Sequence, residues 1–454
     1  MLTKEENDYL TKTGPGTPMG NLIRQYWIPA LLSSEVPEAD CPPVRIRLLS
    51  EDLVAFRSTA GKVGLLQAGC PHRSADLFFG RNEEEGIRCT YHGWKFDTAG
   101  TCVDMPSEPP ESTFKERVQA VAYPCVEVNG AVWTYMGPRS VPPPFPEFES
   151  VTREGASLGR LGMLDCNWLQ SIENNMDTAH LAFMHYGSIP PEAGDDAQWA
   201  QELEAATPEF LKYALRQRDP RFEVKDTEFG LSYTGYRDAE PETSYHRVMH
   251  YFMPIYTMTP SIKMGSGCST AAIVPVDDTH CMEWGFSYRE GGPNAKPVDY
   301  RAPRSDDPNL PNTSDPLGRF RYAIGPKNDF ELDREVQRTD RRTVRGYTGM
   351  KQISVQDRAL TLSQGTNVDR TTEHLGLSDV VIIRARELLT KAARALEEHG
   401  TTPPGVDKPE LCVQRSGWLM LPKSADFWEG SQHLREAYAR QKQAEMAAPM
   451  PTVS

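Results

Sequence analysis

Long hydrophobic runs are missing from this sequence of 454 residues. The longest apolar stretches, such as residues 380–383, cover only a few positions, whereas a helix that spans a membrane needs about 20. Residues 1–7 lack the basic region and the following apolar segment of a secretion signal. We therefore expect neither a membrane anchor nor export, and hence a cytoplasmic protein.

Positive charge is also scarce. The chain has 49 Lys and Arg against 63 Asp and Glu, a net charge of −14. Proteins that bind nucleic acid usually present an excess of basic side chains to the phosphates, so the composition argues against a nucleic-acid partner. The nine cysteines are odd in number and scattered, which is typical of reduced thiols rather than of a disulfide framework.

The remaining composition is that of a large folded protein. Hydrophobic residues make up 39% of the chain and charged residues 25%, close to ordinary globular usage. The length is enough for about three domains of roughly 150 residues, and a chain of this size buries enough surface to fold without disulfides. No unit of roughly 20–50 residues repeats along the sequence, which excludes solenoids and propellers.

Between residues 44 and 133 the sequence alternates short apolar runs with Gly and Pro. This pattern predicts a small all-β domain. The pair Asn129-Gly130 follows an apolar run and predicts a hairpin turn. A proline-rich segment at 141–146 then predicts a semi-rigid connector.

The second part mixes predicted helices and strands, so that an α+β fold is expected overall. A helix is predicted from 379 to 399, with Ser378 as its cap and Gly400 at its end. Residues 291–318 hold six prolines and predict a long loop or a lid. The predicted buried face of the 379–399 helix consists of Val380, Ile383, Leu388, Ala392 and Leu396. The other predicted elements are a helix at 167–185 and strands at 228–236, 246–258, 271–276 and 281–288.

Two short segments each hold one cysteine and one histidine: Cys70-x-His72 and, after sixteen residues, Cys89-x-x-His92. Zinc sites usually place two like ligands in each arm, whereas here each arm is mixed. A mixed set suits a two-iron, two-sulfur cluster of the Rieske type, in which the two cysteines bind the buried iron and the two histidines the outer one. Zinc binding and a coincidental grouping of core residues are the alternatives.

The residues that flank these ligands are consistent with two tight loops. Pro71 stiffens the first segment, and Gly93 allows the second to turn. Tyr91 is positioned to donate a hydrogen bond to a cluster sulfur, a contact that tunes the reduction potential.

Asp177, His180 and His185 form a second group on the helix predicted at 167–185. On a regular helix they share one face, although the two histidines are further apart than the usual i,i+4 spacing of metal ligands; a local π-type turn would bring them together. Two neutral histidines and one carboxylate with open positions form the facial triad of non-haem iron(II) oxygenases. The alternative is a pair of hydrogen-bonded core histidines.

The segments at 70–73 (CPHR) and 89–94 (CTYHGW) resemble the Rieske motif in the large subunits of ring-hydroxylating oxygenases. The spacing Asp177-x-x-His180-x₄-His185 is similar to the mononuclear-iron motif of the same family. The resemblance covers most of the chain. It implies a small all-β Rieske domain and a larger catalytic domain of the helix-grip type, in which helices cover an antiparallel sheet.

In that family the Asp of the second motif bridges a Rieske histidine of one subunit to an iron-binding histidine of the next. Asp177 matches this position, and His180 and His185 match two iron ligands. The third ligand is a later Asp, and the segment at 353–358 (ISVQDR) resembles the family's ligand region and favours Asp357. Spacing alone leaves Asp333, Asp340, Asp357 and Asp369 open. Tyr91, Trp94 and Asn174 are expected to surround the metal sites without binding metal.

Residues 16–21 (GTPMGN), 79–84 (FGRNEE) and 104–108 (DMPSE) most resemble the phthalate dioxygenase branch, which includes O-demethylases of methoxylated aromatic acids. The resemblance implies a homotrimer or a stacked pair of trimers, and a separate flavin and iron–sulfur reductase through which NAD(P)H supplies electrons. The expected enzyme uses a [2Fe-2S] cluster, a mononuclear Fe(II) and O2 to hydroxylate or O-demethylate an aromatic carboxylic acid.

Three parts are expected along the chain. Residues 1–25 form an N-terminal segment that packs on the catalytic domain, residues 26–143 the Rieske domain, and residues 144–454 the catalytic domain with its C-terminal helices. The alternative interpretation of the whole chain is a Rieske electron-transfer protein whose second domain only docks partners.

An aromatic acid needs a counter-charge in its pocket, and Arg is the natural bidentate partner of a carboxylate. Arg237 and Arg247 lie on predicted strands between the two iron-ligand regions, and Thr178, beside Asp177, is expected to face the pocket. A protein of charge −14 does not attract anions by its overall field, so acid recognition must be local. Three further arginines, Arg216, Arg218 and Arg221, lie in a charged stretch and fit a solvated surface equally well.

Overall fold

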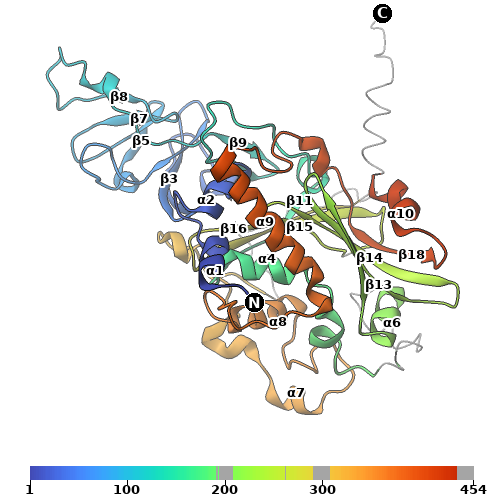
Figure 1. Ribbon diagram of the computed structural model, residues 1–454. Coiled ribbons are helices and arrows are strands. Elements are labelled where there is room, and N and C mark those ends of the chain that lie inside the picture. The colour runs from blue at the N-terminus through green and yellow to red at the C-terminus, as the bar shows by residue number, and fades with distance from the viewer. Residues whose placement is uncertain (191–192, 194–207, 261, 290–306, 437–454) are drawn as a thin grey trace, which may run out of the picture.

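A computed structural model describes residues 1–190, 193, 208–260, 262–289 and 307–436 (Figure 1). A small β part projects at one end of a larger part, in which helices cover an antiparallel sheet. The helices α1 (Lys4–Thr11) and α2 (Pro18–Ile23) both pack against α9 (Val380–His399), close to the other end of the chain. The expected α+β fold is confirmed.

Three small antiparallel sheets make up the projecting part. The hairpin predicted at Asn129-Gly130 is confirmed, since both residues have positive φ, 50° and 73°, as a two-residue turn that matches the strand twist requires. The strands are β2 (Val44–Leu48), β3 (Glu51–Arg57) and β4 (Val63–Gln67) in one sheet, β5 (Arg81–Glu83), β6 (Gly86–Arg88), β7 (Lys95–Asp97) and β8 (Cys102–Asp104) in another, and β1 (Trp27–Leu32), β10 (Ala131–Tyr135) and β9 (Cys125–Val128) in the third.

The larger part is built on an eight-stranded antiparallel sheet. Its strands follow the order β11-β17-β16-β15-β14-β13-β12, and β18 pairs with β14. The strands are β11 (Ser157–Leu164), β12 (Arg221–Thr227), β13 (Gly230–Asp238), β14 (Thr243–Phe252), β15 (Tyr256–Met258), β16 (Gly267–Pro275), β17 (Cys281–Arg289) and β18 (Gly417–Pro422).

Three of the four strands predicted for this sheet are present, with shifted ends, as β13, β16 and β17. The single strand predicted at 246–258 is wrong. The chain leaves β14 after Phe252 and re-enters the sheet as β15 at Tyr256. Pro254 lies in the break, and because proline has no N–H to donate to a ladder, it favours an interruption there.

The helix predicted at 379–399 is confirmed as α9. Gly400 ends it in the left-handed conformation, with φ of 64°. Ser378 is not the cap, however, because Leu377–Asp379 form a 3₁₀ turn that runs directly into the helix. The carboxylate of Asp379 accepts a hydrogen bond from the N–H of Gly376 at 2.7 Å instead.

The predicted buried face of α9 is confirmed in part, since Ala392 is buried and Val380, Leu388 and Leu396 pack partly buried against the core. Val381, Ala385 and Leu389 are buried, whereas Ile383 is 36% exposed. Alanines at the centre of this face let the helix approach α4 (Trp168–Met176) and the sheet closely, and a pattern of large apolar residues does not reveal them. Helices α4 and α9 cover the same face of the sheet, α4 over β15 and β16 and α9 over β12 and β13 (Figure 1).

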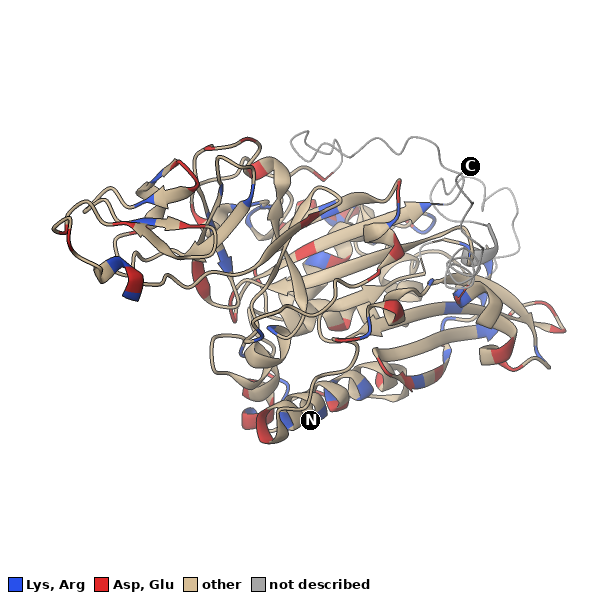
Figure 2. Ribbon diagram, turned by 90° about the horizontal axis from the view of Figure 1, so that it is seen from above, with Lys and Arg blue, Asp and Glu red and all other residues tan. Residues whose placement is uncertain are grey.

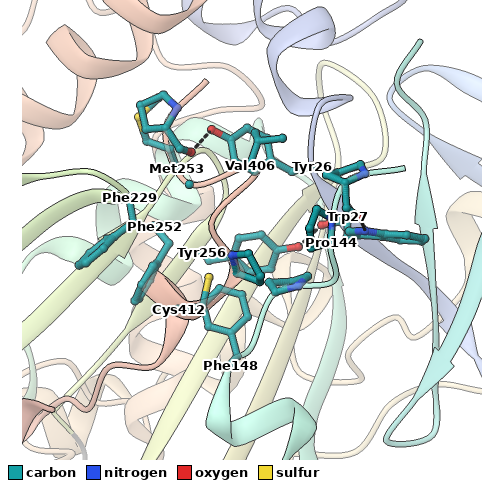
Figure 3. A pocket seen from close by; sticks show the side chains of 15 residues that line it. Tyr26, Trp27, Pro144, Phe148, Phe229, Phe252, Met253, Tyr256, Val406 and Cys412 are labelled. Carbon is teal, nitrogen blue, oxygen red and sulfur yellow. Dashed lines mark hydrogen bonds between the residues drawn. The ribbon is translucent and has the colours of Figure 1, made fainter. Parts of the chain in front are cut away.

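The two parts of the molecule meet at the proline-rich connector (Figure 3). The hydroxyl of Tyr26 donates a hydrogen bond to the carbonyl oxygen of Pro404 at 2.7 Å. The indole N–H of Trp27 donates one to the carbonyl oxygen of Pro143 at 2.8 Å. The cavity between these residues holds about 30 Å³, roughly the volume of one water molecule. This apolar junction therefore packs the two parts together and is too small for a substrate.

The loop predicted at 291–318 can be compared only in part, because residues 291–306 lie outside the described residues. In the rest of this segment, Asp307 pairs with the buried Arg358 at 2.9 Å. No helix in the described part of the chain is long and apolar enough to cross a bilayer, and acidic and basic side chains are interspersed along the elements (Figure 2). The remaining helices are α3 (Glu149–Thr152), α6 (Pro208–Arg216), α7 (Arg334–Thr339), α8 (Ile353–Ser363) and α10 (Phe427–Arg435).

Candidate active site

Two loops of the small part bring together the four residues that the sequence predicts as cluster ligands. Cys70 and His72 lie between β4 and β5, and Cys89 and His92 lie between β6 and β7. Both cysteines are buried, and the centroids of the two imidazole rings lie 4.5 Å apart. The Nδ1 atom of His92 is buried and has no hydrogen-bond partner among the described residues, an unmet requirement that a bound metal would satisfy.

The second ligand loop depends on a glycine, as the sequence predicts. The N–H of Gly93 donates to the carbonyl oxygen of Cys89 at 2.9 Å, which closes the turn. Gly93 has a φ of 79°, and a Cβ atom at this position would lie 2.5 Å from the ring of Pro106. Any other residue would strain the backbone and displace the loop.

Trp94 and Tyr91 flank the two imidazole rings. The ring of Trp94 stacks on His72, with centroids 4.4 Å apart and an interplanar angle of 13°, and so holds that ring in place. The ring centroids of Tyr91 and His92 lie 3.9 Å apart, and Tyr91 is 58% exposed. The hydrogen bond predicted from Tyr91 to a cluster sulfur stays a prediction.

The environment of the cysteines suits metal ligands rather than free nucleophiles. Burial raises the pKa of the Cys70 thiol to about 11, and the neighbouring Cys89 adds to the effect. A thiol with this pKa stays protonated at neutral pH unless a cation compensates the thiolate charge. The donor set and its burial therefore fit an iron–sulfur cluster.

Donor atoms of His180, His185 and Asp357 meet beside the large sheet, all within 4.8 Å of one another. The Nε2 atoms of His180 and His185 lie 3.5 Å and 3.3 Å from Oδ1 of Asp357. That oxygen is buried and accepts no hydrogen bond within the described structure. An unpartnered buried carboxylate oxygen costs free energy, which a cation bound between the three donors would offset.

The helix predicted at 167–185 is wrong in its second half. Helix α4 ends at Met176, and Asp177 is extended, with φ of −72° and ψ of 130°. A π-type turn, η4 (Leu181–His185), follows. The π turn proposed from the histidine spacing is thus confirmed, with the two imidazole centroids 5.3 Å apart, but Asp177 does not share a helix with them.

The break in the chain brings Asp177 back onto His180. One carboxylate oxygen of Asp177 lies 3.1 Å from Nδ1 of His180, and the other accepts a hydrogen bond from the N–H of Ala179 at 2.6 Å. Burial opposes the ionisation of Asp177, but these hydrogen bonds and the charge of His180 outweigh it and lower its pKa. The ionised carboxylate accepts the Nδ1 proton, so that Nε2 is the ring nitrogen turned towards Asp357.

Gln356 is a residue of this site that the sequence reasoning missed. Its Oε1 lies 2.7 Å from Nδ1 of His185, and its Nε2 donates to the carbonyl oxygens of Val344 and Met350 at 3.0 and 2.9 Å. The two donated bonds orient the amide, so that Nδ1 of His185 must carry the proton. The only signal in the sequence is its position immediately before Asp357.

Of the four aspartates that spacing leaves open, Asp357 alone lies with the two histidines. The other three stabilise local turns. Asp333 caps α7 by accepting from a backbone N–H, Asp340 bonds to backbone N–H groups just after α7, and Asp369 accepts from Thr371.

A cavity of about 340 Å³ opens beside these donors, within the usual size of small-molecule sites. Asn174, Thr178 and Arg247 line it, together with His180 and Asp357. The buried hydroxyl of Thr178 accepts a hydrogen bond from Nε of Arg247 at 3.0 Å. Thr178 therefore holds the guanidinium group of Arg247 in the cavity wall.

Arg237 is fully buried next to Arg247. Across the β13–β14 ladder Gly235 pairs with Arg247 and Arg237 with Tyr245, so that the two arginines are diagonal neighbours on one face. Nε of Arg237 donates to the carbonyl oxygen of Gln217 at 2.7 Å, whereas Nη1 and Nη2 have no partner in the part of the chain that the structure describes. Burial and the charge of Arg247 lower the pKa of Arg237 to about 10, which still leaves it a cation at neutral pH.

Of the five candidate arginines, only Arg247 lines this cavity. Arg216 approaches Glu240 to 4.0 Å, and Arg221 pairs with Asp238 at 2.8 Å. Arg218 donates to the carbonyl oxygen of Ile189 at 2.6 Å.

The cavity wall also holds an ion pair that the sequence reasoning missed. Nη1 of Arg160, on β11, lies 3.1 Å from Oε1 of Glu283, on β17. Strand β11 was not among the predicted elements, and the pairing of the two strands is decided by the sheet. No pattern in the sequence links the two residues.

Two protein families match the chain. The Rieske [2Fe-2S] domain matches residues 26–124, and the family described as LigXa C-terminal domain like matches residues 134–447. The second match alone covers more than half of the chain, and the two together leave only the ends and a short connector outside.

Proteins of known function resemble the chain over most of its length. It is 40% identical to the oxygenase subunit of 3-chlorobenzoate-3,4-dioxygenase from Comamonas testosteroni, over 94% of this chain and 97% of that protein. It is 33% identical to the phthalate 4,5-dioxygenase oxygenase subunit of Pseudomonas putida, over 87% of each chain. It is also 33% identical to the 5,5'-dehydrodivanillate O-demethylase oxygenase subunit of a Sphingobium species, over 84% of this chain and 77% of that one.

Solved structures share the fold. Pseudomonas putida NdmA with caffeine superposes with a TM-score of 0.56 at 18% identity, over 86% of this chain and 96% of that one. The reduced complex between oxygenase and ferredoxin in carbazole 1,9a-dioxygenase superposes with a TM-score of 0.51 at 17% identity, over 89% of this chain and 96% of that one.

The predicted recognition and enzyme class are thereby confirmed. A Rieske oxygenase uses a [2Fe-2S] cluster, a mononuclear iron and O2. The oxygenase subunit of such an enzyme receives electrons from a separate protein. The chain therefore belongs to the Rieske non-haem iron oxygenases, as a terminal oxygenase of the aromatic dioxygenase and O-demethylase type.

Proposed function

We propose that this oxygenase acts on an aromatic carboxylic acid, and either hydroxylates its ring or removes the methyl group of a methoxy substituent. One observation carries the proposal: Arg247 lines the cavity beside His180 and Asp357, and the fully buried Arg237, its diagonal neighbour behind the cavity wall, adds a second positive charge. A buried cation without a counter-charge is costly, and a bound carboxylate would supply the counter-charge. The relatives named for chlorobenzoate and phthalate are consistent with an acid.

The mononuclear iron would be bound by His180, His185 and Asp357, since two neutral imidazoles and one carboxylate form a facial set with open positions. Bound there, the iron supplies the activation of O2 and the transfer of oxygen to a C–H bond or ring. Asp177 and Gln356 hold the two imidazoles by accepting their Nδ1 protons. These contacts present both Nε2 lone pairs to one point beside Asp357.

The [2Fe-2S] cluster would be held by Cys70 and Cys89 on the buried iron and by His72 and His92 on the outer one. The buried thiols and the unpartnered Nδ1 of His92 support this assignment. Trp94 orients the ring of His72 by stacking on it. Electrons would come from a flavin and iron–sulfur reductase that oxidises NAD(P)H.

Arg247 would bind the carboxylate of the substrate, and Arg237 would raise the positive potential at the same point. Thr178 fixes the guanidinium group of Arg247, so the ring of the acid would be held in one orientation next to His180 and Asp357. A bidentate arginine–carboxylate pair gives both energy and direction. The position of the ring, rather than the overall charge of the protein, would select the reacting carbon.

The assembly would be a ring of three chains. Large apolar side chains are exposed around the cluster loops: Phe79 is 64%, Tyr91 58% and Phe114 45% exposed. Such a patch around a redox centre suits contact with another protein, and a neighbouring copy would bring its Asp177 to this face. The expected division into an N-terminal segment (1–25), a Rieske domain (26–143) and a catalytic domain (144–454) would then repeat around the ring.

The test is a screen of benzoates, phthalates and methoxylated benzoates with the reductase present, following O2 uptake, ring diols and formaldehyde. Arg247→Gln should lower kcat/KM for the accepted acid by about tenfold or more, the loss of a charge-assisted hydrogen bond, and Arg237→Gln, which removes only a charge behind the wall, should lower it by less. Arg216→Gln, outside the cavity, is the matched control and should match the wild type. Equal turnover of the acid and its methyl ester would contradict the proposal.

A further inference from the structure

Two walls of the active-site cavity carry different sets of charges. Strands β11 and β14 are separated in the sheet by β17, β16 and β15, so Arg160 and Arg247 reach the cavity from opposite sides. On the β14 side, Arg247 has a second arginine, Arg237, as its diagonal neighbour. On the β11 side, Arg160 is paired with Glu283 at 3.1 Å. One wall therefore presents a cation, Arg247, with a second buried cation behind it, and the other wall presents a neutral pair.

The neutral pair keeps unused hydrogen-bonding capacity. Both Arg160 and Glu283 line the cavity, with side chains 30% and 10% exposed. A guanidinium group has five N–H donors and a carboxylate two acceptor oxygens, more than the closest contact of the pair, from Nη1 to Oε1, uses. A small group beside the pair, in the cavity, can accept from Arg160 and donate to Glu283 at the same time.

A hydroxyl group matches this arrangement, since it is one donor and also an acceptor. A second carboxylate does not match, because Glu283 would repel it and already neutralises Arg160. A methyl group does not match either, because it would cover the remaining donor and acceptor atoms of the pair without bonding to them. The pair therefore discriminates both against dicarboxylates and against purely apolar substituents.

We propose that Arg160 and Glu283 form a second polar subsite, which binds a phenolic hydroxyl, so that the substrates are aromatic acids with a hydroxyl on the ring. The proposal rests on the proposed function, because the carboxylate at Arg247 fixes the other end of the molecule. His180 and Asp357 line the cavity as well, so that a ring held at both ends lies against the metal site.

The experiment is calorimetric titration of the metal-loaded enzyme without O2, so that binding is measured apart from turnover. The ligands are 3- and 4-hydroxybenzoate, the two methylbenzoates of matching shape, and isophthalate and terephthalate. At one ring position at least, the hydroxyl compound should bind the wild type about tenfold or more tightly than the methyl compound. In Glu283→Gln this preference should fall to about threefold or less. The matching dicarboxylate should gain affinity, since Arg160 has lost its counter-charge.

Glu223→Gln, on β12 at the far edge of the sheet, is the matched control and should keep all wild-type affinities. Equal binding of hydroxyl and methyl compounds at both positions, or a preference that survives Glu283→Gln, overturns the subsite and leaves the proposed function standing. If no benzoate binds at all, the proposed function fails and the subsite fails with it. The wild-type comparison needs no variant and decides the matter even if Glu283→Gln does not fold.

Discussion

The two imidazoles of the metal site are held by side chains of different charge. The carboxylate of Asp177 faces Nδ1 of His180, whereas the neutral amide of Gln356 faces Nδ1 of His185. An imidazole bonded to an anion is a stronger donor to a metal than one bonded to an amide. At the scale of single residues, the two proposed ligands of one metal would thus differ in donor strength.

Gln356→Met keeps the length of the side chain but removes the acceptor for His185. We expect iron affinity at this site to fall by about 10- to 100-fold, the usual effect of removing a group that orients a ligand. Anaerobic titration of chelator-treated protein with Fe(II) measures it, and the paramagnetic resonance signal of the reduced cluster should not change. Gln364→Met, at the exposed end of the same helix, should bind iron normally, and Gln356→Glu should bind better than Gln356→Met. Unchanged affinity in Gln356→Met would show that His185 needs no partner.

At the scale of elements, the end of α4 is held by buried ion pairs. Glu173 lies one turn before Asp177 and meets Arg370 at 2.9 Å and Arg386, on α9, at 2.6 Å. Removing one partner from a buried pair costs about 3–5 kcal/mol. Glu173→Ala should lower the free energy of unfolding by that amount in urea titrations. Glu228→Ala, which breaks the exposed pair with Lys408, should cost less than about 1 kcal/mol, and similar losses in the two variants would refute the role of the buried pairs.

Strand β14 carries two buried neutral histidines on the face turned away from the cavity. Burial lowers the pKa of both His246 and His250 to about 4. Unfolded chains take up these protons near pH 6.5 while the folded protein does not, so stability falls as pH decreases from about 6.5 to 4. Each histidine should contribute a loss of about 2 kcal/mol between pH 6.5 and 4.5. Urea titrations across this range should show a shallower pH dependence in His250→Gln, and an unchanged slope would contradict the assignment.

At the scale of the whole molecule, the cluster loops lie in the projecting part, and the metal site lies beside α4 in the larger part (Figure 1). If the assembly is a ring, chains with Cys89→Ser and chains with His180→Ala should complement each other when they are expressed together. In random trimers from equal amounts, three-quarters are mixed and each mixed ring has one productive junction in three, so about a quarter of the activity should return. Each variant alone should be inactive. Mixed trimers that form without activity would refute the exchange between chains and the bridging role of Asp177.

Much of the site could be predicted from the sequence because its ligands lie close together along the chain. The mixed Cys and His arms at 70–72 and 89–92 have the spacing of two tight loops. Glycine at position 93 predicted a turn with positive φ, and the structure has one there. The pair His180 and His185 indicated a π-type turn, because two residues that are five positions apart point in different directions on a regular α-helix. The helix at 380–399 and the hairpin at 129–130 likewise depend on local periodicity and turn chemistry.

Only the tertiary structure decided the contacts between distant segments. Spacing left four aspartates open, and the packing of α8 beside η4 brings Asp357 to the histidines. Gln356, Arg160 and Glu283 carry no local signal, because their partners come from other strands and helices through the sheet order and register. The sequence by itself determined the chemistry of the two metal centres, since ligand type and short spacing are local properties. The cavity that selects the substrate was decided by the fold, because its walls come from strands far apart along the chain.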